Sequence, residues 1–234
     1  MACAAPEANI KKAETLVRIA HQRGAQIVLL QELFQHTYFP IELSSQNFHL
    51  ADTLESSGIL RGMQALAKEL SVVLPISFFE RYKNSYYNSV AVIDADGSIL
   101  GVVRKAHISG TVKSILEIIH PYEGHVVDVH SVDRLGYNDK YYFTPSDDPV
   151  PVFHTVSRHV GTEESDGVQV TFCGSSFITG NTGELLKIAD RDSEGVLVDT
   201  LPLGKFHIRR ASWGLLRDRR PHLYKGLLTR DGSA

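Results

Sequence analysis

The spacing of apolar residues predicts two amphipathic helices early in the chain. Over residues 6–23, apolar side chains recur every three or four positions, with lysines and glutamate between them. Pro6 suits a first helical turn, and Gly24 suits the end of a helix. Residues 60–70 repeat the same spacing. Both segments are therefore predicted to be helices with one apolar face.

Three apolar segments with other patterns predict strands. The run AQIVLL, residues 25–30, is nearly pure apolar, as expected for a strand buried on both faces. SVVLPISFFE, residues 71–80, also predicts a strand, although Pro75 is unusual inside one. Residues 86–94 and 98–104 flank Asp96-Gly97, which is a strong signal for a hairpin turn.

The second half is rich in strand patterns. VQVTFCGSSFI, ELLKIA and GVLVDT predict consecutive antiparallel strands, with a turn at residues 181–183 after the first of them. The tail SWGLLRDRRPHLYKGLL has no such pattern and predicts an irregular arm. Helices and strands alternate first and strands dominate later, so the fold class is predicted to be layered α/β.

Composition narrows the class of protein. The 234 residues are 43% hydrophobic and 22% charged, with a formal net charge of -3, as in ordinary globular proteins. Two cysteines cannot build a disulfide framework, which indicates a reducing compartment. The charge gives no general attraction to nucleic acid or to an anionic membrane, and the start lacks a signal-peptide pattern. We therefore expect a cytoplasmic protein that binds neither nucleic acid nor membrane.

Two charged residues at predicted strand ends are candidates for chemistry. Glu32 follows AQIVLL, and Lys105 ends the second hairpin strand. Each, taken alone, is more often a solvated surface residue. Together in one cleft they could supply a general base and a cation that stabilises an oxyanion.

No residue type in a suitable pattern supplies a nucleophile. Cys3 lies at the start of the chain, and Cys173 lies inside a predicted strand, where a buried structural cysteine is the default interpretation. The serines of CGSSFI do not match a nucleophile elbow. The cluster HPYEGHVVDVH matches no zinc spacing, so no metal is expected. The run RDRRP predicts a solvated or subunit-contacting arm.

Longer stretches of the chain resemble one family. GAQIVLLQELF, LPISFFERYKNSYYNSVAVIDADGSILGVVRKAHI, GYNDKYYFTPSD, GSSFITGNTGEL and SWGLLRDRRPHLY are similar to the N-carbamoylputrescine amidase branch of the nitrilase, or carbon–nitrogen hydrolase, superfamily. The resemblance covers residues 2–108, 136–154 and 157–231.

The resemblance implies an αββα sandwich that assembles into homo-oligomers, and a Glu–Lys–Cys triad that needs no cofactor. Glu32 matches the general base and Lys105 the lysine that stabilises the tetrahedral intermediate. Asp139 falls where the family usually has a second glutamate that orients the site. Tyr38 and Phe39 would line the substrate pocket.

The chain departs from the family pattern at three places. The cysteine-tryptophan-aspartate block that carries the nucleophile is absent, because the chain passes from VPVFHTV directly into SRHVGTEESDG. This places a deletion near 156/157. Residues 109–135 are an atypical insertion, and the N-terminal strand is nearly gone. We therefore expect a single domain over 1–234 whose sandwich is incomplete.

The expected function follows from both sets of observations. The resemblance implies hydrolysis of the carbamoylated amine N-carbamoylputrescine to putrescine, carbon dioxide and ammonia in polyamine biosynthesis. Without the nucleophile, the chain as written is expected to be inactive. Two alternatives remain open: a non-catalytic subunit that binds full-length family subunits, and an unstable splice or gene-model product.

Overall fold

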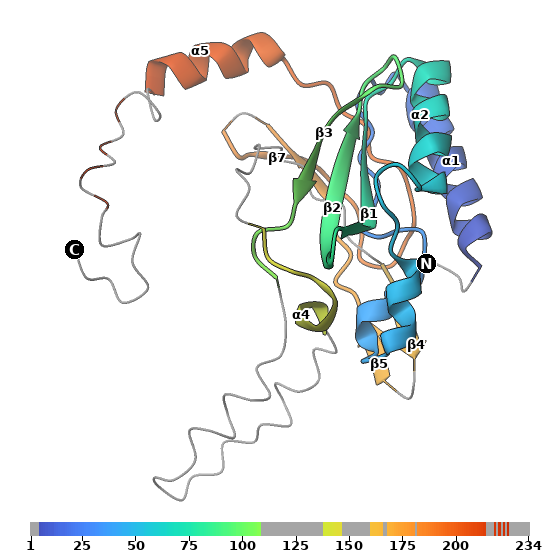
Figure 1. Cartoon of the computed structure of the whole chain (residues 1–234). Helices are drawn as coiled ribbons and strands as arrows, with labels where there is room; N and C mark the ends of the chain where they lie inside the picture. The colour runs from blue at the N-terminus through green and yellow to red at the C-terminus, as the bar shows by residue number, and fades with distance from the viewer. Residues whose placement is uncertain are drawn as a thin grey trace, which may run out of the picture.

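The computed structural model describes residues 5–108, 138–146, 160–165, 168–180 and 182–213, together with residues 218, 220, 222 and 224. Figure 1 shows how the elements are arranged. In chain order they are α1 (Pro6–Gln22), the 3-10 turns η1 (Phe39–Ile41) and η2 (Ser45–Leu50), α2 (Gly58–Leu70), β1 (Leu74–Tyr82), β2 (Ser85–Ile93), β3 (Ile99–Arg104), α4 (Asp139–Tyr142), β4 (Thr162–Ser165), β5 (Val168–Thr171), β6 (Phe177–Thr179), β7 (Leu185–Ile188) and α5 (Leu203–Trp213).

The two predicted helices are confirmed as α1 and α2, which lie together on one side of a three-stranded sheet (Figure 1). Gly24, at φ +87°, follows α1 as expected for a helix end. Ser57 caps α2 by accepting a hydrogen bond from the Leu60 backbone N–H. Their buried faces include Val17, Leu60 and Met63, each 0% exposed.

The predicted hairpin is confirmed as β2 and β3, and β1 pairs with the other edge of β2. Gly97, at φ +88°, makes the turn between them, and an added Cβ would lie 2.8 Å from the Gln64 carbonyl oxygen. Pro75 lies in β1, which is an edge strand of this sheet, where a missing N–H donor is tolerated.

Alternation along the strands gives the sheet two different faces. Leu74, Ile76 and Phe78 of β1 are at most 1% exposed and pack in the core under α1 and α2. Burying each such side chain stabilises the fold by about 1.5–3 kcal/mol. Phe79 of the opposite face packs in a second, aromatic cluster with Phe39.

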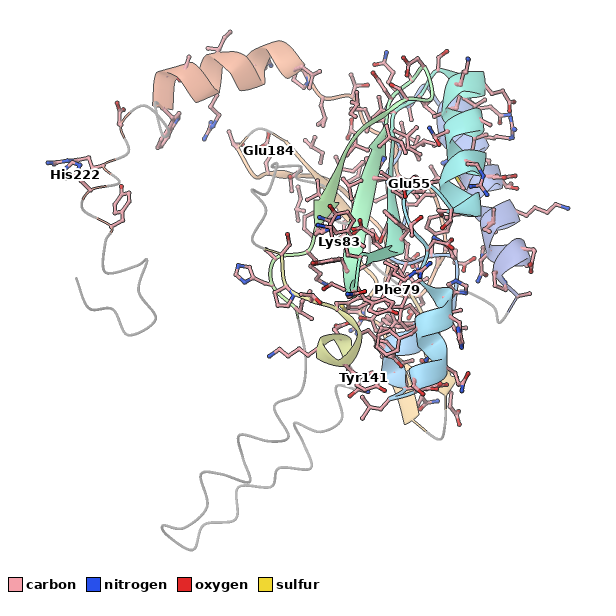
Figure 2. The ribbon with its side chains drawn as sticks, viewed as in Figure 1. Glu55, Phe79, Lys83, Tyr141, Glu184 and His222 are labelled. Atoms are coloured by element: carbon pink, nitrogen blue, oxygen red, sulfur yellow. The ribbon has the colours of Figure 1, made fainter. Side chains whose placement is uncertain are left out.

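The second cluster brings together segments that are far apart in the chain. Phe48 of η2 contacts the rings of Phe79 and Tyr141 at centroid distances of 6.3 and 5.7 Å. Figure 2 shows Phe79 and Tyr141 in the dense group of side chains where the sheet, η2 and α4 meet. This cluster therefore fixes α4 against the sheet.

The prediction of a buried strand over residues 25–30 is wrong. Only Ile27 makes a bridge, a parallel one to Val73, and Ile27 is 64% exposed. A strand buried on both faces needs a neighbour at each edge and cover on each face. Among the described residues, Val73 is the only bridge partner of this segment, so the segment is extended but forms no strand, although Val28 packs in the core.

Strand predictions in the second half are correct only in part. The hairpin β6–β7 forms, with Gly183 at φ +83° in its turn. VQVTFCGSSFI is not one strand, because Gly174 and Ser175 both have positive φ and separate β5 from β6. Cys173 therefore lies outside a strand and is exposed, so the prediction of a buried structural cysteine is wrong.

Residues 195–200 form no strand, contrary to the prediction for GVLVDT, although Val196 packs against the core. The first two residues of the predicted irregular tail, Ser212 and Trp213, end helix α5. The described residues give a mixed α/β fold with a three-stranded sheet and two two-stranded sheets, and these do not form a closed αββα sandwich.

Several predictions fall outside the described residues. These are Cys3, the insertion at 109–135 with its histidine cluster, and the junction near 156/157. In the part of the chain that is described, no helix is long and apolar enough to span a membrane.

Candidate active site

Strand register places three polar residues on the face of the sheet opposite α1 and α2. Ser77 lies on the same face of β1 as Phe79, which pairs with Asn88 of β2. Arg104 of β3 pairs with Ser89 of β2, so the next residue, Lys105, lies opposite Asn88. The Lys105 backbone N–H donates to the Asn88 carbonyl at 2.8 Å. Ser77, Asn88 and Lys105 therefore project from one face, because side chains alternate along strands.

A turn after residues 25–30 brings Glu32 to this face. Leu33 has φ +48°, an unfavourable conformation for a leucine, and its N–H donates to the Ser77 hydroxyl at 3.1 Å. The Asn9 side chain of α1 donates to the Gln35 carbonyl at 3.0 Å. These bonds fix the turn at both ends, and so they determine where Glu32 lies.

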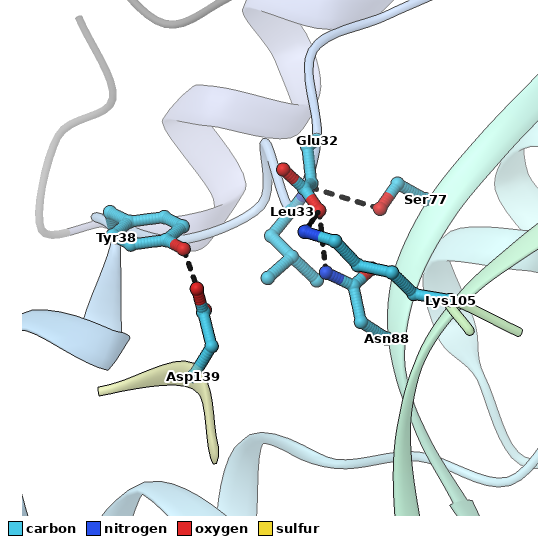
Figure 3. A network of polar contacts seen from close by, with 7 residues as sticks. All are labelled: Glu32, Leu33, Tyr38, Ser77, Asn88, Lys105 and Asp139. Carbon is cyan, nitrogen blue, oxygen red and sulfur yellow. Dashed lines mark hydrogen bonds and ion pairs between the residues drawn. The ribbon is translucent and has the colours of Figure 1, made fainter. Parts of the chain in front are cut away.

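Glu32 meets Lys105 and Asn88 at one carboxylate oxygen (Figure 3). Lys105 Nζ lies 3.1 Å from Glu32 Oε1, and Asn88 Nδ2 donates to the same oxygen at 2.5 Å. The Lys105 and Glu32 side chains are 33% and 37% exposed, whereas Asn88 is 4% exposed. The two residues expected to share a site thus form an ion pair that solvent reaches.

Asp139 lies beside this pair in α4 but bonds to another group. Its Oδ1 accepts a hydrogen bond from the Tyr38 hydroxyl at 2.7 Å (Figure 3). Burial raises the pKa of the Asp139 carboxyl, while the Tyr38 hydrogen bond and the charge of Lys105 act in the opposite direction. Asp139 is thus close enough to Lys105 to feel its charge, and its hydrogen bond goes to Tyr38.

Tyr38 and Phe39 are both 6% exposed and belong to the aromatic cluster. Both line a cavity of about 230 Å³ whose lining does not include Glu32, Lys105 or Asp139. Three carboxylates, Glu42, Glu163 and Glu164, line the cavity, and no lysine or arginine among the described residues does. Tyr38 connects this cavity to Asp139, because Tyr38 lines the cavity and its hydroxyl donates a hydrogen bond to Asp139.

Two polar residues in the lining of this cavity, Glu163 and His36, are affected by burial. Glu163 of β4 accepts a hydrogen bond from the Tyr38 N–H at 2.7 Å and is 7% exposed. Burial lowers the pKa of His36, which also lines the cavity, against the opposing effect of Asp52.

On the other face of the sheet, a buried ion pair supports the end of β3. Arg104 donates to both carboxylate oxygens of Glu80, at 2.6 and 2.7 Å, and Ser89 donates to the same group at 2.6 Å. The guanidinium lies over the rings of Tyr82 and Tyr87, 4.4 and 4.7 Å from their centroids. Because Lys105 directly follows Arg104, this network anchors the backbone that carries the lysine.

The sequence did not point to Asn88, Ser77 or the Glu80–Arg104 pair. The hairpin predicted that a residue of β2 lies opposite Lys105, and the observed register of β2 against β3 makes that residue Asn88. Of the residues considered as nucleophiles, Cys173 is exposed and Cys3 lies outside the described residues. Within the described residues, no group of three metal-ligating side chains converges.

Comparison with known proteins shows the family to which the chain belongs. The carbon–nitrogen hydrolase family profile matches residues 2–163. The crystal structure of a carbon–nitrogen hydrolase from Helicobacter pylori G27 superposes with a TM-score of 0.77 at 25% identity, covering 98% of this chain and 96% of that one. The chain belongs to the carbon–nitrogen hydrolase family of the nitrilase superfamily.

Relatives of known activity narrow the comparison. The N-carbamoylputrescine amidase of Solanum lycopersicum is 35% identical over 296 residues, covering 96% of this chain and 91% of the relative. A citrullinase of Francisella tularensis is 31% identical over 283 residues, covering 92% of this chain and 91% of the relative. Both proteins are named for activity on a carbamoylated amine, and the chain is similar to each.

Proposed function

We propose that the chain is an N-carbamoylputrescine amidase-type subunit that keeps the base and the cation of the site but not the nucleophile. It would bind a carbamoylated amine at Glu32 and Lys105 without hydrolysing it. The observation that carries the proposal is the Glu32–Lys105 pair, 3.1 Å apart and open to solvent. The role in polyamine biosynthesis is part of the same proposal.

The chemistry assigned to the pair follows from its charges. In the family reaction, a cysteine thiol gives its proton to a glutamate and attacks the ureido carbon. The glutamate passes the proton to the nitrogen that leaves, and water then hydrolyses the thioester, which regenerates the thiol and gives a carbamic acid that breaks down to carbon dioxide and the second amine. Glu32 would accept the proton, and Lys105 would stabilise the negative oxygen of the tetrahedral intermediate. Neither group can replace the missing thiol, because a carboxylate and an ammonium ion leave water as the attacking group.

Sequence comparison supports an internal loss of the nucleophile block. The match to the tomato relative extends over 296 positions, more than the 234 residues of this chain, so the alignment opens gaps in this chain. The cysteines of the chain are Cys3 and Cys173, and neither is followed by tryptophan. We place the loss near 156/157 and treat 109–135 as an insertion within a single domain.

The cavity beside Tyr38 favours N-carbamoylputrescine over citrulline as the ligand. N-carbamoylputrescine carries a free ammonium group at the end opposite the ureido group, whereas citrulline carries a carboxylate there as well as an amine. Three glutamates line the cavity, and among the described residues no lysine or arginine does. Their charges would attract a cationic end and repel a carboxylate.

The proposal is tested by titrating the purified chain with each ligand and measuring heat. We expect N-carbamoylputrescine to bind at least several-fold more tightly than citrulline, and Glu32→Gln and Lys105→Ala to weaken its binding. Lys187→Ala is the control, because Lys187 lies on β7 and bonds to the Val198 carbonyl. Equal binding by the wild type and both site variants would contradict the proposal.

A second candidate function, a non-catalytic subunit that binds other family subunits, is favoured by exposed apolar side chains on α5. Leu203, Ile208 and Trp213 are 65%, 71% and 62% exposed. They point in different directions around the helix, so a partner that covers them would have to surround α5. Size-exclusion chromatography of the chain mixed with a full-length amidase subunit tests this, and separate elution at all concentrations would exclude it.

A further inference from the structure

We infer that Asn88 is a positioning residue of the Glu32–Lys105 site, which holds Glu32 by Oε1 and thereby leaves Oε2 as the oxygen that accepts a hydrogen bond from the ligand. The inference rests on the proposed function and extends it, because it assigns separate tasks to the two oxygens of one carboxylate.

Asn88 forms hydrogen bonds with both Glu32 and Lys105 from a buried position in the middle of the sheet. Its side-chain Nδ2 donates to Glu32 Oε1 at 2.5 Å, and its backbone carbonyl accepts from the Lys105 N–H at 2.8 Å. It lies on β2, the middle strand of the three-stranded sheet, and is 4% exposed. A side chain with so little freedom can fix a carboxylate that is itself 37% exposed.

Both donors to Glu32 converge on Oε1. Lys105 Nζ and Asn88 Nδ2 approach that oxygen, and no described residue donates a hydrogen bond to Oε2. Figure 3 shows the second oxygen pointing away from the two nitrogen atoms. An N–H of the ligand's ureido group would therefore donate to Oε2, whose lone pairs are available, without breaking either existing bond.

A neutral donor suits this task better than a second cation. A buried amide must be hydrogen-bonded to offset its desolvation, and Asn88 meets that need at the carboxylate of the site. Its N–H orients Glu32 and adds no charge beside Lys105. The arrangement ties the orientation of Glu32 and the backbone of Lys105 to the same residue of the sheet.

Ser89 provides a matched control for the role of Asn88. It is the next residue of the same strand, is 0% exposed, and donates its hydroxyl to Glu80 on the opposite face. Asn88→Ala and Ser89→Ala each remove one buried hydrogen bond to a carboxylate. Only Asn88→Ala removes a contact to Glu32. A difference in ligand binding between the two variants therefore reflects the site and not the stability of the strand.

The test uses the full chain and has two arms. The first records side-chain amide resonances by ¹⁵N NMR in the wild type and in Glu32→Gln. We expect the Asn88 amide protons to move upfield when the charge of Glu32 is removed. The amide of Asn47, which donates to the neutral Tyr142 hydroxyl at 3.0 Å, should stay in place. An Asn88 amide that does not respond overturns the inference.

The second arm measures binding of N-carbamoylputrescine to the variants. We expect Asn88→Ala to weaken binding roughly tenfold, because Glu32 loses the donor that orients it. Ser89→Ala leaves both hydrogen bonds between Arg104 and Glu80 in place, so it should change binding less than about twofold. Equal losses in the two variants overturn the positioning role. If the wild type does not bind the ligand, the proposed function fails, while the first arm still decides whether Asn88 holds Glu32.

Discussion

The Glu80–Arg104 pair gives a sharp test of how burial determines the strength of an ion pair. Glu80→Gln keeps the size and shape of the side chain and removes its charge. The Glu80 and Arg104 side chains are 3% and 19% exposed, so the guanidinium would lose its partner where water reaches it poorly. The chain also contains an exposed pair of the same type, Arg18–Glu69, with side chains 43% and 55% exposed.

The structure sets the expected magnitudes. Breaking a buried ion pair by removing one partner costs about 3–5 kcal/mol. Two features reduce that cost here: Arg104 keeps its contacts with the Tyr82 and Tyr87 rings, and glutamine can still accept one hydrogen bond. We therefore expect Glu80→Gln to lower the free energy of unfolding by about 2–3 kcal/mol. Glu69→Gln breaks a solvent-exposed pair with the same two-point geometry. It should change the free energy of unfolding far less than Glu80→Gln does, because solvent screens an exposed pair.

Equilibrium urea unfolding followed by far-ultraviolet circular dichroism measures both variants against the wild type. The difference between the two, rather than either value alone, tests the reasoning. Equal small losses for Glu80→Gln and Glu69→Gln would show that the network under β3 contributes no more than a surface pair. In that case the account of how Lys105 is anchored would be wrong.

Three further substitutions test other parts of the structure. Because burial raises the folded-state pKa of Asp139, its contribution to stability is fully present below its ordinary pKa of 3.8 and is lost as pH rises through the folded value. Asp139→Asn should flatten that pH dependence in unfolding measurements, and an unchanged profile would contradict the assignment. Ser71→Gly, at an exposed helix end with φ +53°, should stabilise the chain by about 0.5–1 kcal/mol, seen as a higher Tm. Gly97→Ala should destabilise it by about 1–3 kcal/mol, because φ is positive and the Cβ meets the Gln64 carbonyl; an unchanged Tm would contradict this.

Local patterns predicted the elements whose partners are close in sequence. The helices α1 and α2 and the hairpin β2–β3 follow from apolar spacing and from the Asp96-Gly97 turn. The segment 25–30 could not be predicted correctly, because its state depends on which strands lie beside it. Its apolar pattern is suited to a sheet interior, and the described chain provides only the bridge to Val73.

The sequence predicted that Glu32 and Lys105 lie together, but it did not predict Asn88, which holds them in place. Glu32 and Lys105 follow from strand ends and from the family resemblance. Asn88 was hidden by a bulge between Val92 and Ile93, which shifts the register of β2 against β3 by one residue. Counting from the turn without that bulge places Tyr87 opposite Lys105 and turns Asn88 to the other face. Cys173 was misplaced because Gly174 and Ser175 break the strand, a conformation that alternation of residue types does not show.

The central claim is that this chain keeps the base and the cation of a carbon–nitrogen hydrolase but does not turn over its substrate. Ammonia release from N-carbamoylputrescine by the purified chain tests it most directly, with Glu32→Gln and Cys173→Ser measured beside the wild type. The account predicts release no faster than a buffer blank for all three proteins. Turnover by the wild type that Glu32→Gln abolishes would contradict it, and loss of that turnover in Cys173→Ser would identify the nucleophile.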